Sequence, residues 1–224
     1  MCKKSGFELL ESLCNIFGPS GCEDPVAKAI LENIEGCYDT LIPNRCCGVI
    51  AHIKGNGKSE KKLMLSAHMD EVGFMIKSIC DDGTLKIASM CGGDTRIMAG
   101  RRVVISRDGE KLVRGVFALK PIHLLKGDEY DNSASMDELY LDIGAADKEE
   151  AEKMVSVGDY ATFESDFVRF GEDDRMIKAK AIDDRAGCAI MCDLMKELYP
   201  IRDEIPFDMY FAFTCREELG ITVS

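Results

Sequence analysis

Short β-like runs crowd the stretch between about residues 72 and 180, and this density constrains the fold more than any other feature of the chain. Clusters of turn-forming residues, such as DDG, CGGD and RDGE, separate the runs. Closely spaced strands with such turns are typical of a small β-barrel or β-sandwich. One charged segment, DKEEAEKMV, predicts a short helix among them. The expected strands are VGFMIKSI, LKIASM, RRVVIS, VRGVFAL, YLDIGA and DYATFES.

Helices and strands are predicted to alternate on both sides of this β-rich stretch. Apolar residues recur three or four positions apart in residues 5–17, which predicts a helix, and a second helix begins at the end of GPSGCEDP. GVIAHIKG, KKLMLSAH and PFDMYFAFT predict strands, and a third helix follows AKAIDD. We therefore expect an α/β fold in which residues 1–71 and 179–224 form an open α/β domain. Residues 72–178 are expected as a β-rich, barrel-like insertion.

The chain is acidic, since 40 Asp and Glu against 28 Lys and Arg give a formal charge of −12. This charge repels nucleic acid and anionic membrane surfaces, so neither is expected as a partner. The N-terminus shows no long apolar core of a signal peptide, and no run approaches the ~18 apolar residues needed to span a membrane. We therefore expect a cytoplasmic protein.

Eleven cysteines are present, and most stand singly within apolar patterns, as Cys188 and Cys192 do. The one vicinal pair is Cys46-Cys47. An odd number of scattered cysteines predicts reduced thiols that are buried as small apolar residues, and argues against a disulfide framework.

Three polar clusters follow apolar strands: His68-x-Asp70-Glu71, Asp183-Asp184 and Glu217-Glu218. Sites in open α/β sheets form just beyond the carboxyl ends of strands, so the clusters are expected to converge. One histidine with several carboxylates suits Zn²⁺, Co²⁺ or Mn²⁺. A second carboxylate near a ligating histidine commonly orients its ring, and adjacent glutamates can divide metal binding from proton transfer.

Each cluster alone also has a structural interpretation. HMDE is typical of a turn, DDR is typical of a helix cap because Asp is favoured at helix N-termini, and REEL is typical of a solvated helix face. Only their common order, each after a strand, favours a functional site.

Several stretches together resemble the di-metal aminopeptidases of the tetrahedral (TET) glutamyl aminopeptidase type, members of which have also been labelled cellulase M or endoglucanase. The resemblance runs from about residue 6 to about residue 220. The matching stretches are GPSGCE, LMLSAHMDEVGFMI, GRRVVI, KPIHLL, DIGAADKEEAE, GDYATF, AKAIDDRAGCAI and YFAFTCREELG.

The resemblance implies a role for each residue of the clusters. His68 is a ligand of one metal ion and Asp70 orients it. Asp183 bridges two ions, with a cis peptide bond following it, and Glu218 is a ligand of the second ion. Glu217 is the general base of a metal-activated water. The cofactors implied are two divalent ions per complete site, Zn or Co.

The resemblance also implies what the enzyme acts on and how it assembles. It is expected to hydrolyse N-terminal residues from peptides, with acidic groups holding the free α-amino group. The insertion of residues 72–178 corresponds to a dimerisation domain, and dimers of this type assemble into dodecameric tetrahedra. Peptide substrates and other copies of the chain are therefore the expected partners.

The resemblance is incomplete at the site. The family has two further ligands, an Asp after the Glu-Glu pair and a His late in a longer chain, and neither has a counterpart here. If Asp183 bridges, each ion has two protein ligands, whereas catalytic zinc usually has three. We expect a partial α/β peptidase domain, truncated at its C-terminus or naturally shortened, with one ion or none bound. His52 and His123 lie outside the ligand positions, and His123 is assigned a structural or interface role.

Three functions remain in competition. The first is a metallo-aminopeptidase or part of one, in which the activity of the 224-residue chain is reduced. The second is a non-catalytic relative that retains the fold and the assembly. The third is a glycoside hydrolase, which paired carboxylates would allow, although the chain has no Trp and only 7% aromatic residues for stacking against sugars.

Overall fold

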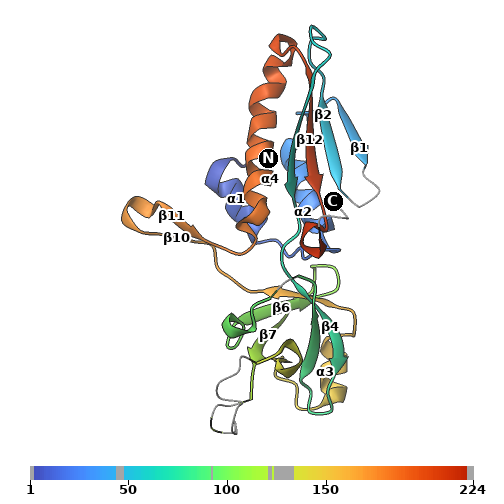
Figure 1. Ribbon diagram of the computed structural model, residues 1–224, viewed down its shortest axis with the longest axis vertical. Helices are drawn as coiled ribbons and strands as arrows, with labels where there is room; N and C mark the ends of the chain where they lie inside the picture. Colours follow the sequence, from blue (N-terminus) through green and yellow to red (C-terminus); the bar gives the residue numbers. More distant parts are fainter. Residues whose placement is uncertain (1–2, 44–47, 92, 121–122, 124–133, 221–224) are drawn as a thin grey trace. The chain divides into compact units, whose positions relative to one another are not determined.

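The chain forms two units, each with its own buried core (Figure 1). One unit comprises residues 1–71 with 166–224, and the other comprises residues 72–165. The structure is a computed structural model, and it describes residues 3–43, 48–91, 93–120, 123 and 134–220. The Cys46-Cys47 pair and most of KPIHLL lie outside the described residues.

A four-stranded mixed sheet forms the centre of the first unit, with strand order β1-β2-β12-β3. Strand β12 lies between two neighbours, parallel to β3 and antiparallel to β2. Its residues Phe211 and Phe213 are at most 1% exposed, and because they are two positions apart they share the face that packs in the core of the first unit. The strands are β1 (Thr40–Pro43), β2 (Val49–Ile53), β3 (Lys62–His68) and β12 (Asp208–Thr214).

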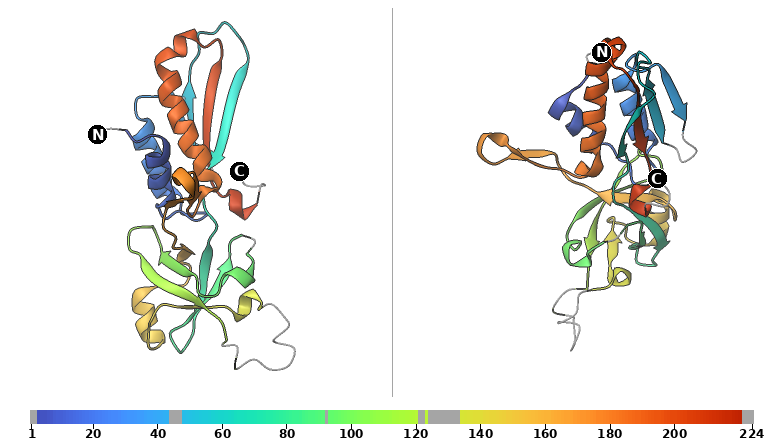
Figure 2. Two further views of the ribbon diagram at one scale, coloured as in Figure 1. Left: turned by 90° about the vertical axis from the view of Figure 1, so that its left-hand side faces the viewer. Right: turned by 45° about the horizontal axis from the view of Figure 1, so that its top comes forward.

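Three helices pack in the first unit: α1 (Gly6–Cys14), α2 (Asp24–Ile34) and α4 (Ile182–Leu198). Helix α4 lies against β3 and also contacts α1 and α2 (Figure 2). In α2, Val26, Ile30 and Ile34 recur every four residues and are buried. Pro25 stands in the first turn, where a missing N–H costs no helical hydrogen bond.

Buried cysteines contribute to this core as small apolar residues. Burial raises the pKa of Cys14 to about 11 and that of Cys192 to about 12, so both thiols remain neutral. Cys188 is also buried, and none of these three forms a disulfide. The prediction of reduced, buried thiols is confirmed for these residues.

The second unit is a closed barrel with strand order β4-β5-β8-β7-β6-β9 and antiparallel neighbours. Phe74 packs edge-to-face against Phe117, with ring centroids 5.1 Å apart, and against Phe163 at 5.4 Å. The strands are β4 (Phe74–Ile79), β5 (Leu85–Ser89), β6 (Arg102–Ser106), β7 (Val113–Ala118), β8 (Tyr140–Asp142) and β9 (Tyr160–Phe163), with helix α3 (Lys148–Met154).

A two-stranded ribbon, β10 (Val168–Phe170) with β11 (Met176–Lys178), follows the barrel. The two strands pair only with each other among the described residues, and Phe167 and Ile177 pack against the core of the first unit. The structural boundary therefore lies after residue 165, whereas the sequence placed the end of the insertion at residue 178.

The α/β class with a barrel-like second unit confirms the fold class expected from the sequence. In the part of the chain that the structure describes, no helix has the length and apolar character needed to cross a membrane.

Candidate metal centre

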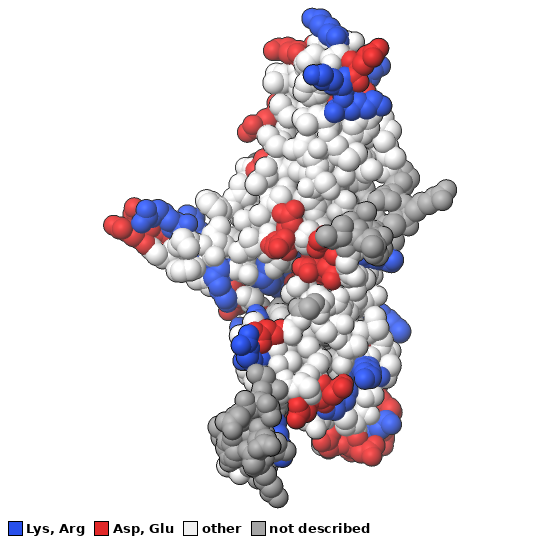
Figure 3. All heavy atoms as spheres, viewed as in Figure 1, with Lys and Arg blue, Asp and Glu red and all other residues white. Residues whose placement is uncertain are grey.

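Three chain segments bring polar side chains to the carboxyl ends of two neighbouring parallel strands. His68 is the last residue of β3 and lies opposite Thr214, the last residue of β12. After β12 the chain turns into the short 3₁₀ helix η7 (Glu217–Leu219). Asp183 stands at the start of α4, which packs on β3. Figure 3 shows acidic side chains gathered near the end of β12.

His68 is the centre of this arrangement. Its Nε2 lies 3.1 Å from Asp183 Oδ1 and 3.8 Å from Glu217 Oε2. One possible ligand atom from each of His68, Glu217 and Glu218 lies within 4.8 Å of the others. The structure thus brings together the four residues that the sequence assigned to metal binding and proton transfer.

Asp70 lies behind the imidazole and is fully buried. Its Oδ1 is 3.4 Å from His68 Nδ1, and its backbone oxygen is 3.1 Å from the same nitrogen. Its two carboxylate oxygens also accept the backbone N–H groups of Glu217 and Glu218, each at 3.1 Å. A fixed partner on Nδ1 orients the ring so that Nε2 faces Asp183 and Glu217.

The electrostatics of the cluster follow from these contacts. Burial disfavours a charged imidazole, but the bonds to Asp70 and Asp183 outweigh burial and raise the pKa of His68 to about 9. The pKa of Glu218 is also raised, by burial and by the neighbouring charges of Asp70, Glu217 and Asp183. Negative charge is therefore concentrated where a cation would relieve the repulsion.

The donor set fits a divalent cation. One imidazole nitrogen with several carboxylate oxygens is the mixture that Zn²⁺, Co²⁺ and Mn²⁺ accept in proteins. The side chain of Asp183 is 91% exposed, so its carboxylate is accessible to a cation. The side chain of Glu217 is 37% exposed, so a substrate can reach it, although it is less exposed than Asp183.

Asp184 and Glu71 belong to the sequence clusters but have structural roles. Asp184 Oδ1 accepts the backbone N–H of Gly187 at 3.0 Å, so Asp184 caps the first turn of α4. Glu71 is 1% exposed, and its Oε1 lies 2.5 Å from Lys180 Nζ and 3.4 Å from Arg185 Nη2. The peptide bond between Asp183 and Asp184 is cis, as the resemblance implied.

Arg185 is a residue whose importance the sequence did not reveal. It is fully buried, and its guanidinium donates to Glu71 and to several backbone oxygens. These carbonyl oxygens belong to Leu13, Ile16, Gly18 and Met69. Arg185 therefore ties the end of α1 and the residues after β3 to the start of α4, which carries Asp183.

The other two histidines do not join the cluster. His52 on β2 has its Nε2 3.3 Å from Asp208 Oδ2, at the opposite end of β12 from Thr214. His123 is exposed, and its structural or interface role remains a prediction.

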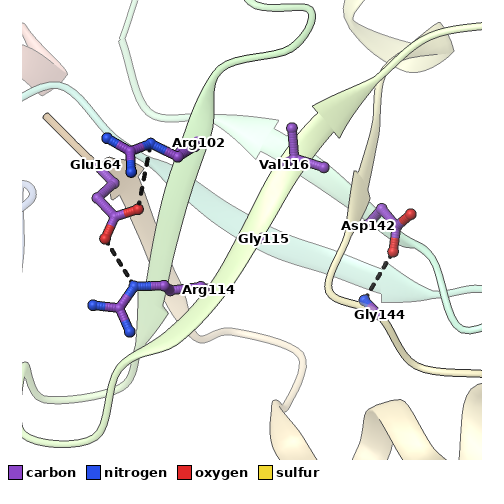
Figure 4. A pocket seen from close by; sticks show the side chains of 7 residues that line it. All are labelled: Arg102, Arg114, Gly115, Val116, Asp142, Gly144 and Glu164. Carbon is purple, nitrogen blue, oxygen red and sulfur yellow. Dashed lines mark hydrogen bonds and ion pairs between the residues drawn. The ribbon is translucent and has the colours of Figure 1, made fainter.

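A shallow pocket on the barrel is a separate concavity (Figure 4). Arg114 Nε lies 2.8 Å from Glu164 Oε1, and Arg102 Nε lies 3.7 Å from Glu164 Oε2. Glu164 pairs with both guanidinium groups, and Asp142 supplies a second carboxylate to the lining, so the charges of the pocket balance and we assign it no function.

The sequence of residues 47–224 matches the family described as M42 glutamyl aminopeptidase. The chain belongs to the M42 family. Enzymes of the M42 family are peptide hydrolases that use divalent metal ions. The matched region contains every residue of the candidate metal centre.

Individual relatives agree with the M42 assignment. The chain is 36% identical over 215 residues to an aminopeptidase-family protein of Acetivibrio thermocellus, covering 96% of this chain and 59% of that protein. It superimposes with a TM-score of 0.89 on a TET aminopeptidase from Thaumarchaeota archaeon SCGC AB-539-E09, at 32% identity, covering 96% of this chain and 60% of that one. The TM-score against the TET1 peptidase of Pyrococcus horikoshii is 0.83 at 30% identity, covering 96% and 62%. That peptidase assembles into a tetrahedron or a large octahedral shell. The chain thus spans about 60% of the length of these relatives.

Proposed function

We propose that this chain carries the site of a metal-dependent aminopeptidase that removes N-terminal residues from peptides. The observation that carries the proposal is the convergence of His68, Asp183, Glu217 and Glu218 beyond the ends of β3 and β12. Membership of the M42 family supports the reaction class.

In this proposal, His68 Nε2, Asp183 and Glu218 would hold the cations, and Asp183 would be shared between two of them in a complete site. The ions are Zn²⁺ or Co²⁺, for which the nitrogen and oxygen donors are suited. The described donors supply only two protein ligands per ion when Asp183 is shared, so we propose that the 224-residue chain binds one ion or none.

The remaining residues orient groups and move a proton. A bound divalent cation supplies a Lewis acid, which polarises the scissile carbonyl and lowers the pKa of the attacking water. Glu217 accepts the proton of that water and passes it to the departing amine. Asp70 acts with the site by holding His68 through Nδ1 and by holding the backbone of Glu217 and Glu218.

The proposed substrate carries a free α-amino group, which is positive at neutral pH. Acidic groups around the site would hold this amino group. The formal charge of −12 argues against nucleic acid and anionic membranes as partners. The proposed setting of the reaction is the cytoplasm.

We also propose that the chain assembles with copies of itself, as dimers and then dodecamers, through the second unit. The support is the assembly of the similar TET1 peptidase of Pyrococcus horikoshii into closed shells.

A comparison of two proteins tests the activity. The 224-residue chain and a chimera extended with the C-terminal region of a longer M42 relative are assayed with fluorogenic aminoacyl substrates and Co²⁺ or Zn²⁺. We expect little or no turnover by the 224-residue chain. Displacement of a reacting group by ~1 Å already lowers the reaction rate about 10²-fold. The chimera should hydrolyse the substrates, and Glu217→Gln in the chimera should abolish turnover.

Two outcomes would contradict the proposal. Full turnover by the 224-residue chain that is lost in Glu217→Gln would show that its ligand set is sufficient. A chimera that binds Co²⁺ without hydrolysing unblocked aminoacyl substrates would favour the non-catalytic relative instead.

A further inference from the structure

The loop between α1 and α2, which carries the sequence GPSGCE, contacts the metal centre from its buried side. Ser20 in this loop is 1% exposed, and its hydroxyl donates to Asp70 Oδ2 at 2.5 Å. Glu23 at the end of the loop is 3% exposed. Its Oε1 accepts the N–H of Gly21 at 2.9 Å and that of Arg216 at 3.0 Å. The loop therefore holds the site at two separate points.

The first point acts through Asp70. One oxygen of its carboxylate accepts the N–H of Glu217, and the other accepts the N–H of Glu218 as well as the hydroxyl of Ser20. The orientation of this single carboxylate decides whether both backbone bonds to η7 can form. The Ser20 hydroxyl holds the carboxylate in that orientation through its bond to Oδ2.

The second contact, made by Glu23, acts on Arg216, the residue that precedes η7. Arg216 has φ of +63°, in the left-handed region that residues other than glycine rarely adopt. Such a conformation persists where the surroundings impose it. The bond from Arg216 N–H to buried Glu23 is one such constraint from outside η7, and the Arg216 carbonyl also accepts the N–H of Leu219.

We propose that Ser20 and Glu23 are positioning residues that set where η7 presents Glu217 and Glu218. Ser20 acts through Asp70, and Glu23 acts through Arg216. The meaning of this positioning for catalysis rests on the proposed aminopeptidase function, but the positioning itself is a property of the metal-free fold. The GPSGCE loop is thus part of the site although neither side chain touches a reacting atom.

Amide hydrogen exchange, measured by NMR on the metal-free chain in EDTA, tests the proposal. We expect Ser20→Ala to speed exchange at Glu217 and Glu218 about tenfold, because loss of one hydrogen bond loosens the local structure by that order. We expect Glu23→Ala to do the same at Arg216. Glu23→Gln keeps an acceptor oxygen of the same shape and should behave as the native chain does.

Two internal references separate positioning from general destabilisation. Ser12→Ala removes a hydroxyl that donates to the Leu9 carbonyl within α1, at 2.8 Å, and should leave exchange at 216–218 unchanged. The amide of Phe211, in the buried centre of β12, should exchange at its native rate in every variant. Should Ser20→Ala not fold, the paired Glu23→Ala and Glu23→Gln variants decide the question.

A titration with Co²⁺ then connects positioning to the site. Glu23→Ala should weaken Co²⁺ affinity about tenfold, in the range measured for residues that orient metal ligands, and Glu23→Gln should not. Native exchange rates at 216–218 in both alanine variants, or unchanged Co²⁺ affinity in Glu23→Ala, would overturn the inference. If the unmodified chain binds no Co²⁺, the proposed metal site fails, and the exchange rates alone decide the positioning.

Discussion

At the scale of single residues, His68 shows how one side chain links the parts of the site. Its side chain is 9% exposed and contacts carboxylates through both ring nitrogens. These contacts raise its pKa to about 9 against the opposing effect of burial. In the metal-free chain a proton therefore occupies the nitrogen that a cation would need, and the two compete.

A pH titration of the metal-free chain checks this account. We expect His68 to titrate near pH 9 by NMR, and Asp70→Asn to lower this pKa because a bonded carboxylate is lost. The matched control is Asp208→Asn, which changes the carboxylate beside His52 and should leave His68 unchanged.

The sign of the linked stability effect follows from the raised pKa. The stabilisation from protonated His68 is fully present below its unfolded pKa of ~6.5 and is lost as the pH rises through about 9. Urea unfolding in EDTA should therefore show that the difference between the native chain and His68→Gln shrinks from pH 6 to about pH 9.5. A constant difference would contradict the assignment.

Substitution of Arg185 is expected to lower the stability of the fold. Arg185→Lys keeps the charge but cannot reach all the carbonyl oxygens that the guanidinium contacts, so buried acceptors lose their donors. We expect the free energy of unfolding to fall by roughly 3 kcal/mol, measured by denaturant titration. Arg175→Lys on the exposed β10–β11 ribbon is the control and should change it by less than about 0.5 kcal/mol. Equal changes in the free energy of unfolding of the two variants would show that Arg185 does not tie α1 and the residues after β3 to α4.

At the scale of elements, the close approach of α4 to β3 brings Asp183 near His68. Gly187 lies on the first turns of α4, and a Cβ there would stand 2.9 Å from Ala67 Cβ and 2.6 Å from Asp184 Oδ1. Glycine at this position is required by the packing, since the helix could not lie as close to the strand with a larger residue.

Gly187→Ala is expected to destabilise the chain in spite of alanine's better helix propensity. Ala67 Cβ is attached directly to the β3 backbone and cannot move away, so overpacking should outweigh the ~1 kcal/mol propensity gain. We expect a net loss of about 1 kcal/mol or more in thermal or denaturant unfolding. Glu197→Ala, at an exposed position of the same helix, should be nearly neutral. A stabilised Gly187→Ala variant would show that α4 can shift without cost.

At the scale of the whole molecule, the two units have separate cores and separate expected tasks. The barrel closes on itself through β9 and β4, so it leaves no unpaired edge strand within that sheet. The first unit carries the candidate metal centre. This division permits the second unit to be removed without cutting through a strand of the first.

Deletion of residues 72–165 tests the proposed assembly role. With a short Gly-Ser linker in their place, the chain should give smaller species in size-exclusion chromatography with light scattering. The matched control replaces residues 168–178, the β10–β11 ribbon, and should retain the assembly mass. An unchanged mass after removal of the barrel would count against assembly through the second unit.

Local sequence patterns determined the elements of this protein and the identity of its polar clusters. The periodic apolar residues of α1 and α2, the strand KKLMLSAH, and the turn-separated strands of the barrel lie where the sequence predicted them. Such patterns act over a few residues, since a helix or strand buries one side of its own short segment. The placing of His68, Asp183, Glu217 and Glu218 at segment ends was visible for the same reason.

Only the tertiary structure decided which residues contact and position those polar clusters. Ser20 meets Asp70, Glu23 meets Arg216, and Arg185 reaches the carbonyl of Leu13, across separations of 50, 193 and 172 positions. The register of β12 on β3, which sets Thr214 beside His68, is fixed by how two distant segments pair and bury their faces. The end of the second unit at residue 165 likewise depends on Phe167 and Ile177 packing on the other core. No local pattern encodes these contacts, because their energies arise when segments far apart in the chain exclude water together.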